Sequence, residues 1–327
     1  MAPPTPEPAV VSYGTRASTT RVVRRGPHLF HWHRTPGVTT VKPAGPPPPP
    51  VLRHLTGQPA ENAVRFAVPR VAGPPSRDPA RPRQEPPDVV YELPDSVSIG
   101  WHMLAGAAVP RQYTDVVSRV GRAVRTLHQG PAPLAPHRPV PWLGGLCDWL
   151  SRRPDALSER LVRRLGAGRC ALLARWAEEA SAVADTVVLG TLSPGVIVVD
   201  ARDRTAHVLV GAEAGHGAPA LDVGAFAEAL STSVDVALAG AHHDPEQLDY
   251  PSLWQAFDSG YGPGRPGEAA VRRAALLRRV HRLRAMSGHI GDNAFLQVQI
   301  DRLPALVEQQ GGPLIPAPRD GAGAWER

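Results

Sequence analysis

The stretch "TVVLGTLSPGVIVVD", residues 186–200, decides the fold. It places two runs of apolar, mostly β-branched residues on either side of a Gly-x-Leu-x-Pro-Gly turn, which is typical of two buried strands with a tight turn between them. The polar segment "DARDRT" overlaps the end of the second run and precedes another apolar run, "AHVLVG". We therefore expect a β-hairpin over residues 186–211, with "DARDRT" as its turn.

The segments around this hairpin differ in periodicity. Residues 10–41 carry β-branched and aromatic residues between Gly and Pro turns, and "VVYEL" at 89–93 indicates one more buried strand. From about residue 112, apolar residues recur at helical spacing, so helices should fill most of the chain up to residue 309 outside the hairpin. Strands first and helices afterwards predict an α+β fold with a small β-rich N-lobe and a larger helical C-lobe.

The chain divides into four predicted parts, with the boundary between the lobes near Tyr91–Pro94. These parts are a disordered Pro-rich tail at 1–9, the N-lobe at 10–93, the C-lobe at 94–310 and a flexible tail at 311–327. Because the 38 prolines cluster in tails and loops, the apolar 42% of the chain can still build a core in the lobes.

Charge and cysteine content bound the class of protein. Lys plus Arg outnumber Asp plus Glu by 36 to 30, a net charge of +6 that permits binding of nucleic acid or of an acidic peptide without requiring either. Two cysteines make no disulfide framework and no zinc site. The sequence has no run of about 18 apolar residues and no signal peptide at its start, so we expect a soluble cytoplasmic protein without a membrane span.

Three motifs in order resemble the aminoglycoside phosphotransferase and choline kinase-like family. "VGRAVRTLHQG" at 120–130 resembles a helix that ends in a Leu-His pair. Residues 186–200 resemble the catalytic loop, usually HGDLHPGN and a strand. "VLVGAEAGHGAPALDVGAF" at 208–226 resembles the metal-ligand strand and the segment after it. The resemblance implies a protein-kinase-like fold that binds ATP between its two lobes.

The same resemblance assigns a role to each position of the loop. The loop histidine falls at Leu189, the catalytic aspartate at Thr191, the metal-holding asparagine at Val196 and the magnesium-binding aspartate at Val210. The retained family residues do structural work in turns and packing. They include Gly190, Pro194, Gly195, Pro219 and Asp222, the last of which braces the catalytic loop in the family.

These replacements predict a degenerate, pseudokinase-like protein without catalytic residues and without a bound metal. Phosphoryl transfer depends on positioning and on neutralisation of the phosphate oxygens by metal, and valine offers no oxygen to Mg²⁺. Threonine at position 191 is a poor base. Glu213 is the nearest acid that could substitute. The alternative that stays open is an active ATP-dependent phosphotransferase acting on a small molecule or on Ser and Thr of a peptide.

Nucleotide binding without magnesium is a separate hypothesis. Lys42, the only lysine, falls where the resemblance places the third-strand lysine that pairs with the nucleotide phosphates. Glu92 and Leu93 fall in the strand whose backbone would meet adenine. An edge-strand lysine and an ordinary buried strand explain the same residues equally well.

The basic segment "AAVRRAALLRRVHRLRAM", 269–286, predicts a helix with arginines on its outer side. Arg272, Arg273 and Arg279 are candidate contacts for an acidic peptide or a partner protein, although a solvated helix face has the same pattern. A basic nucleic-acid-binding protein is a further alternative. Aromatic residues make up 5% of the chain and none interleaves with these arginines for base stacking.

The functional hypothesis is a non-catalytic phosphotransferase-like protein that binds a peptide or protein partner in the interlobe cleft. The resemblance implies a place for it in the biosynthesis of ribosomally made modified peptides, such as thioamitides and class V lanthipeptides. There it would hold a precursor leader peptide or support a lyase or kinase subunit. This step rests on analogy at the level of the fold.

Overall fold

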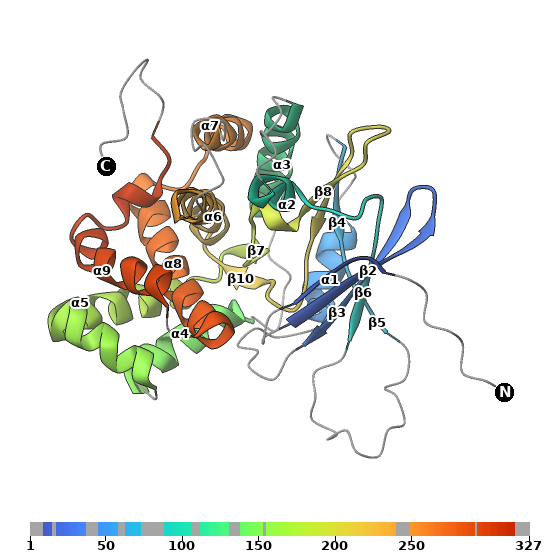
Figure 1. Ribbon diagram of the computed structural model, residues 1–327. Coiled ribbons are helices and arrows are strands. Elements are labelled where there is room, and N and C mark those ends of the chain that lie inside the picture. The colour runs from blue at the N-terminus through green and yellow to red at the C-terminus, as the bar shows by residue number, and fades with distance from the viewer. Residues whose placement is uncertain are drawn as a thin grey trace.

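The computed structural model of the protein shows two parts. It describes residues 9–14, 18–36, 45–57, 63–72, 88–105, 112–130, 138–152, 155–239, 249–291 and 293–317. In Figure 1 a β-rich part formed by the N-terminal strands lies beside a larger helical part that carries the C-terminus. The predicted α+β architecture, with a small N-lobe and a larger C-lobe, is confirmed.

The N-lobe is built on one antiparallel sheet in the order β1-β2-β3-β6-β5. Its strands are β1 (Ala9–Gly14), β2 (Ser18–Gly26), β3 (Leu29–Pro36), β5 (Arg70–Val71) and β6 (Val89–Leu93). Across one face, Val22 is the neighbour of Trp32, and Trp32 is the neighbour of Tyr91. All three are buried in a cluster with Val198 and Leu209. The N-lobe sheet therefore packs on residues 197–209, through Val198 and Leu209.

The quoted segment forms two different pairings. β8 (Ile197–Val199) and β9 (Ala206–Leu209) are an antiparallel hairpin, as predicted. β7 (Thr186–Val188) pairs instead with β10 (Gly215–Gly217), so the prediction of a single hairpin was wrong for its first strand. The cause is Gly190, whose φ of +74° turns the chain away from β7 before β8 begins.

A segment between the N-lobe strands crosses to the core of the C-lobe. α1 (Pro49–Thr56) buries Val51 and Leu55, one turn apart, in the same hydrophobic cluster as the C-lobe helices. β4 (Val64–Ala67) then pairs in parallel with β9 and completes the sheet β4-β9-β8. The N-lobe predicted over 10–93 is thus interrupted, because the apolar side of α1 finds its partners in the other lobe.

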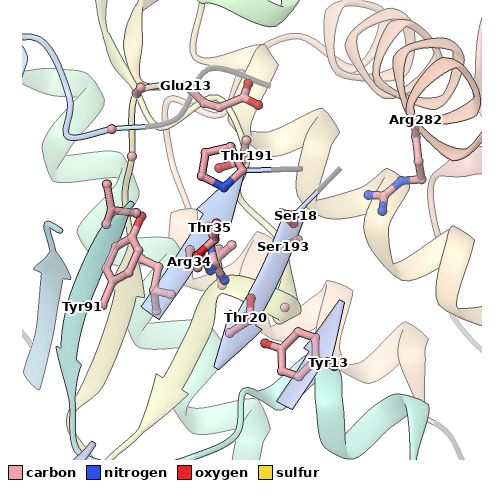
Figure 2. Close-up of a pocket in the computed structure, with 18 of the residues that line it drawn as sticks. Tyr13, Ser18, Thr20, Arg34, Thr35, Tyr91, Thr191, Ser193, Glu213 and Arg282 are labelled. Carbon is pink, nitrogen blue, oxygen red and sulfur yellow. The ribbon is translucent and has the colours of Figure 1, made fainter. Parts of the chain in front are cut away.

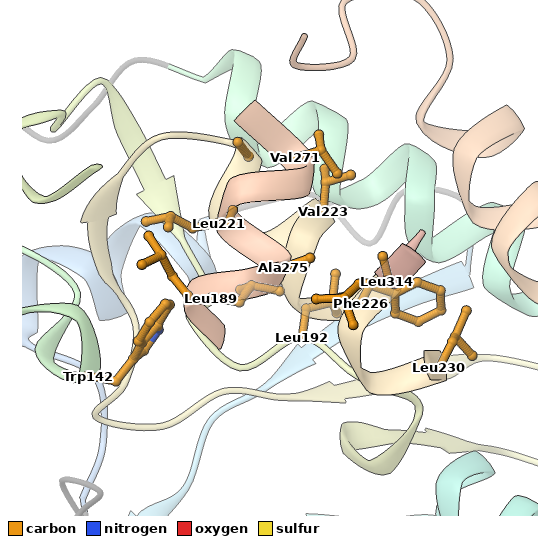
Figure 3. Packing of buried hydrophobic residues seen from close by; sticks show 14 of the residues in the cluster. Trp142, Leu189, Leu192, Leu221, Val223, Phe226, Leu230, Val271, Ala275 and Leu314 are labelled. Atoms are coloured by element: carbon orange, nitrogen blue, oxygen red, sulfur yellow. The ribbon is translucent and has the colours of Figure 1, made fainter. Parts of the chain in front are cut away.

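The C-lobe is a set of packed helices. They are α2 (Ile99–Leu104), α3 (Gln112–Gln129), α4 (Pro141–Arg152), α5 (Ala156–Ala182), α6 (Ala220–Ala239), α7 (Tyr250–Tyr261), α8 (Glu268–Ile290) and α9 (Ala294–Glu308). α6 is buried along most of its length, and Phe226 stacks on Phe257 of α7 with ring centroids 4.3 Å apart. Figure 3 shows side chains of α6 and α8 packed together with those of the loop after β7. Within the described residues, no helix has the length and hydropathy of a membrane span.

The folded C-lobe continues past the predicted boundary at residue 310. A short 3-10 turn, η4 (Gly312–Leu314), follows α9, and Leu314 is buried in the main cluster with Ile315 packed against it. The prediction of a flexible tail therefore fails for residues 311–317, because these apolar side chains reach the core. Residues 1–8 and 318–327, and with them most of the two predicted tails, lie outside the described residues.

A buried ion-pair network joins α6 to α8. Glu228 of α6 is fully buried and accepts from Arg279 Nε at 2.9 Å and from Arg282 Nη2 at 2.7 Å. Arg279 also donates to Asp235 at 2.7 Å. The prediction that Arg279 faces a partner is wrong, since its side chain is 4% exposed and these acids surround it. Burial opposes ionisation of Glu228, but the two guanidiniums outweigh it and lower its pKa to about 2.

Replacing Glu228 with Gln should destabilise the fold by roughly 3–5 kcal/mol at neutral pH, because Arg282 loses its counter-charge and Arg279 keeps only Asp235. The difference in free energy of unfolding between this variant and the wild type should become smaller at acid pH. A carboxylate with a lowered pKa contributes stability above its ordinary pKa, here 4.5, and loses it as the pH falls toward the folded value of about 2. Urea unfolding of both proteins, from neutral pH down to about pH 3, measures the gap.

Glu268→Gln, at the exposed start of α8, is the control and should leave the stability almost unchanged. A stability gap between Glu228→Gln and the wild type that stays constant through the acid range would contradict a charged Glu228 in the folded state.

Candidate functional site

A cavity of about 330 Å³ lies where the N-lobe sheet meets the C-lobe. The sheet contributes mainly hydroxyl-bearing side chains and one cation, namely Tyr13, Ser18, Thr20, Arg34, Thr35 and Tyr91. The C-lobe contributes Thr191, Ser193, Val196, Glu213, Arg278 and Arg282. Figure 2 shows the strand residues on one side of the cavity and Arg282 extending toward it from its helix. This is the interlobe cleft in which the resemblance places ATP.

The loop between β7 and β8 is held in one shape by its backbone. A Cβ on Gly190, which has a left-handed conformation, would lie 2.4 Å from the carbonyl oxygen of Glu213, so this position accepts only glycine. Pro194–Val196 then form one 3-10 turn, η2. α2 packs on η2 so closely that a Cβ on Gly100 would lie 2.7 Å from Gly195 Cα. The residues predicted to be structural shape the loop.

Asp222 anchors this loop to three helices. The fully buried carboxylate of Asp222, in the first turn of α6 just after Pro219, accepts from the backbone N–H of Leu189 at 2.7 Å and of Gly190 at 2.8 Å. His128 Nε2 of α3 lies 3.1 Å from the same carboxylate, and His128 Nδ1 lies 2.8 Å from the hydroxyl of Tyr261 on α7. Because a carboxylate only accepts, Nε2 is the donor.

The four positions to which the resemblance assigns catalysis and metal binding divide into two pairs. Thr191 and Val196 line the cavity. The side chains of Leu189 and Val210 are 2% and 0% exposed and belong to the main hydrophobic core. In the part of the chain that the structure describes, no group of three or more His, Cys, Asp or Glu side chains could hold a metal ion.

Charged side chains from both lobes meet at the cavity. Arg34 of β3 lies over the ring of Tyr91, with Cζ 5.4 Å from the ring centroid. Arg278 of α8 lies over the ring of Trp142 at 5.1 Å. Burial lowers the pKa of Arg278, while the charge of Glu213 opposes that shift. The cavity therefore carries three guanidiniums, with that of Arg282, and one acid among its described lining residues.

Sequence reasoning missed these cavity arginines. Arg34 was one strand residue among several, and Arg278 and Arg282 were assigned to a solvated outer side of the helix. The available signal was the sequence of α8 itself, in which apolar residues such as the run 274–277 and arginines are not separated onto two faces. In such a helix some of the arginines lie on the buried side.

The predicted nucleotide residues that the structure describes do not line the cavity. Lys42 falls outside the described residues, and β3 ends before it. Glu92 of β6 is exposed and pairs with Arg70 at 3.2 Å, while Leu93 is buried in the N-lobe cluster. Neither side chain lines the cavity. A nucleotide role for these residues stays a prediction.

The two outer arginines of the basic helix, Arg272 and Arg273, are partly exposed and pair within the protein. Arg272 forms an ion pair with Glu268. Arg273 lies over the ring of Trp176 at 5.1 Å and donates to Gln310. The pair of Arg272 lies within α8, whereas the contacts of Arg273 join α8 to α5 and to the segment after α9. Partner binding at these two residues stays a prediction.

Replacing Asp222 with Asn should destabilise the protein by about 3 kcal/mol, because the loop amides lose one charged acceptor and face an amide donor instead. Hydrogen exchange of the Leu189 and Gly190 amides should become much faster. Asp185→Asn, an exposed position just before β7, is the control and should change neither property. Unchanged protection of both amides in Asp222→Asn would contradict the anchoring role.

Comparison with known proteins supports the fold. No protein-family model matches the chain, and no curated protein matches it. An ethanolamine kinase from Plasmodium vivax aligns over 92% of this chain and 83% of its own, with 10% identity and a TM-score of 0.53. A Ralstonia eutropha protein assigned as an aminoglycoside phosphotransferase aligns over 95% and 94%, with 13% identity and a TM-score of 0.51.

At these identities the likeness concerns the fold. The two alignments span 95% and 92% of this chain. The chain therefore has the protein-kinase-like α+β fold that these phosphotransferase structures share, with a small β-rich N-lobe and a larger helical C-lobe.

Proposed function

We propose that the chain is a phosphotransferase-like protein that does not transfer phosphate and that binds a peptide or protein partner in its interlobe cleft. The observation that supports this most is the pair of positions at the cavity wall. Thr191 and Val196, which the resemblance assigns to the base and to a metal ligand, both line the cavity, and neither side chain can do that work.

Phosphoryl transfer places two demands on a cleft of this kind. Magnesium needs oxygen ligands, and the acceptor hydroxyl needs an acid that orients it and takes its proton. Glu213 is the one carboxylate among the described residues that line the cavity. Val210 packs in the core with no exposed surface. One carboxylate cannot meet both demands.

The charge of the cleft favours an acidic partner. One structural neighbour is named as an ethanolamine kinase, and an amine is a cation at neutral pH. Three arginines at this cavity would repel such a substrate and attract an anion. A negatively charged segment of a precursor leader peptide, or of a lyase or kinase subunit, is the partner that we propose for this cleft.

A second candidate function, ATP-dependent phosphotransfer, is favoured by the place of Glu213. This residue follows Val210 by three positions, is 6% exposed and lines the cavity. In that case Glu213 would replace the missing metal ligand or base, and the arginines would neutralise the phosphates.

Titration calorimetry with ATP tests the proposal. Adding Mg²⁺ should change the affinity for ATP by no more than about twofold, because Thr191, Val196 and Val210 provide no oxygen ligands that would hold a metal–nucleotide complex. No ADP should form over hours with Mg²⁺ present. Metal-dependent binding together with ATP turnover that Glu213→Gln abolishes would establish the second candidate instead.

Replacing Thr191 with Asp should not create turnover, because Val196 and Val210 still provide no metal ligand. Thr191→Ser is the matched control at the same position. With Mg²⁺ and ATP, both variants should form ADP no faster than a sample without protein. Turnover gained by this single change would show that the metal site lies at residues other than the ones assigned here.

A further inference from the structure

We infer that the interlobe cavity is a binding site for a phosphate monoester, held by arginine side chains without a metal ion. The inference rests on the proposed function and deepens it, since it names the chemical group that enters the cleft. Guanidiniums of Arg34, Arg278 and Arg282 line the cavity, against the single carboxylate of Glu213 among the described lining residues.

Arg278 carries most of the inference. Its side chain lines the cavity although the residue is only 6% exposed. Its Nη1 is buried and donates no hydrogen bond within the described residues. The ring of Trp142 supports the guanidinium from one side, at 5.1 Å, without offering a strong acceptor. A buried donor without an acceptor costs free energy, so the site is suited to an acceptor that enters the cavity.

Arg282 lies one helical turn further along α8, and Glu228 fixes its side chain. Glu228 accepts from its Nε at 2.9 Å and from its Nη2 at 2.7 Å. A guanidinium has five N–H donors. Glu228 occupies the edge formed by Nε and Nη2, and the N–H groups of Nη1 can donate to a ligand. Figure 2 shows the side chain reaching toward the cavity. The fixed edge lowers the entropy that Arg282 loses on binding.

Arg34 approaches from the opposite lobe. It stands on β3 directly across from Thr20 of β2, and both line the cavity. Its guanidinium lies over the Tyr91 ring at 5.4 Å, which limits its motion. Thr191 and Ser193 add hydroxyl donors from the C-lobe side. An oxyanion in the cavity is thus within reach of donors from both lobes.

Phosphate fits this set better than a carboxylate. A phosphate monoester carries close to two negative charges at neutral pH and three acceptor oxygens, so it can bind several guanidiniums at once. A carboxylate carries one charge and would leave the arginines in mutual repulsion. The volume of about 330 Å³ suits a phosphorylated side chain or a small organic phosphate.

Titration calorimetry in EDTA tests the inference, with O-phosphoserine, inorganic phosphate and glutamate as probes. The wild type should bind both phosphates at millimolar concentration or below, and glutamate at least tenfold more weakly. Arg278→Gln and Arg282→Gln should each lose about ten- to a hundredfold in phosphate affinity. Arg175→Gln, at an exposed position of α5 outside the cavity lining, should bind as the wild type does.

Thermal unfolding separates a ligand-binding arginine from a structural one. Arg278→Gln should keep or raise the melting temperature of the unliganded protein, because it removes a buried charge whose Nη1 has no hydrogen-bond acceptor within the described residues. Arg279→Gln, its neighbour, should lower it, because this side chain is paired with Glu228 and Asp235. Phosphate should raise the melting temperature of the wild type but not that of Arg278→Gln.

A phosphoserine peptide and its unphosphorylated form distinguish the source of the phosphate. Tighter binding of the phosphopeptide than of O-phosphoserine identifies a modified peptide, and equal binding identifies a small organic phosphate; both outcomes support the site. The inference is overturned if the wild type binds no phosphate, if Arg278→Gln binds it equally well, or if glutamate binds as tightly.

The two proposals fail in different ways. Turnover of ATP with Mg²⁺ would refute the proposed non-catalytic function and leave the arginine site standing. Absent phosphate binding in a protein that also lacks turnover would refute the arginine site alone.

Discussion

The buried carboxylate of Asp222 is the interaction on which the cleft depends. It accepts from two consecutive loop amides and meets His128, so one side chain ties the loop after β7 to α3 and α6. With both oxygens engaged, the loop has one arrangement, in which Thr191 and Val196 line the cavity. The loop has this fixed shape although neither Thr191 nor Val196 carries an acid or an amide.

The side chains that line the cavity are the reason for proposing anion binding instead of phosphoryl transfer. A phosphate group can be neutralised by a divalent ion or by guanidiniums, but transfer also needs a positioned base. The cavity offers arginines from both lobes and no base other than Glu213 among its described lining residues. On the proposal made above, such a set recognises an anion without transferring phosphate. Glu228 holds Arg282 in place, and Arg278 has a buried Nη1 without an acceptor within the described residues.

Sequence patterns predicted the α+β fold, the β8–β9 strands and the positions of the loop, because these depend on local periodicity and on turn residues such as Gly190. They did not predict that β7 pairs with β10 or that α1 packs on the C-lobe, because such pairings are decided between distant segments. The positions of Arg279 and Arg282 of α8 were predicted wrongly for the same reason. Where these side chains lie depends on Glu228, which precedes Arg279 by 51 residues and Arg282 by 54.

A crystal of the protein soaked with Mn²⁺ and O-phosphoserine tests the central claim most directly. The account predicts density for a phosphate group within hydrogen-bond distance of the Arg278 guanidinium, with no anomalous manganese peak in the cavity. A manganese peak coordinated by Glu213, with the phosphate bound to the metal and not to the arginines, would contradict it.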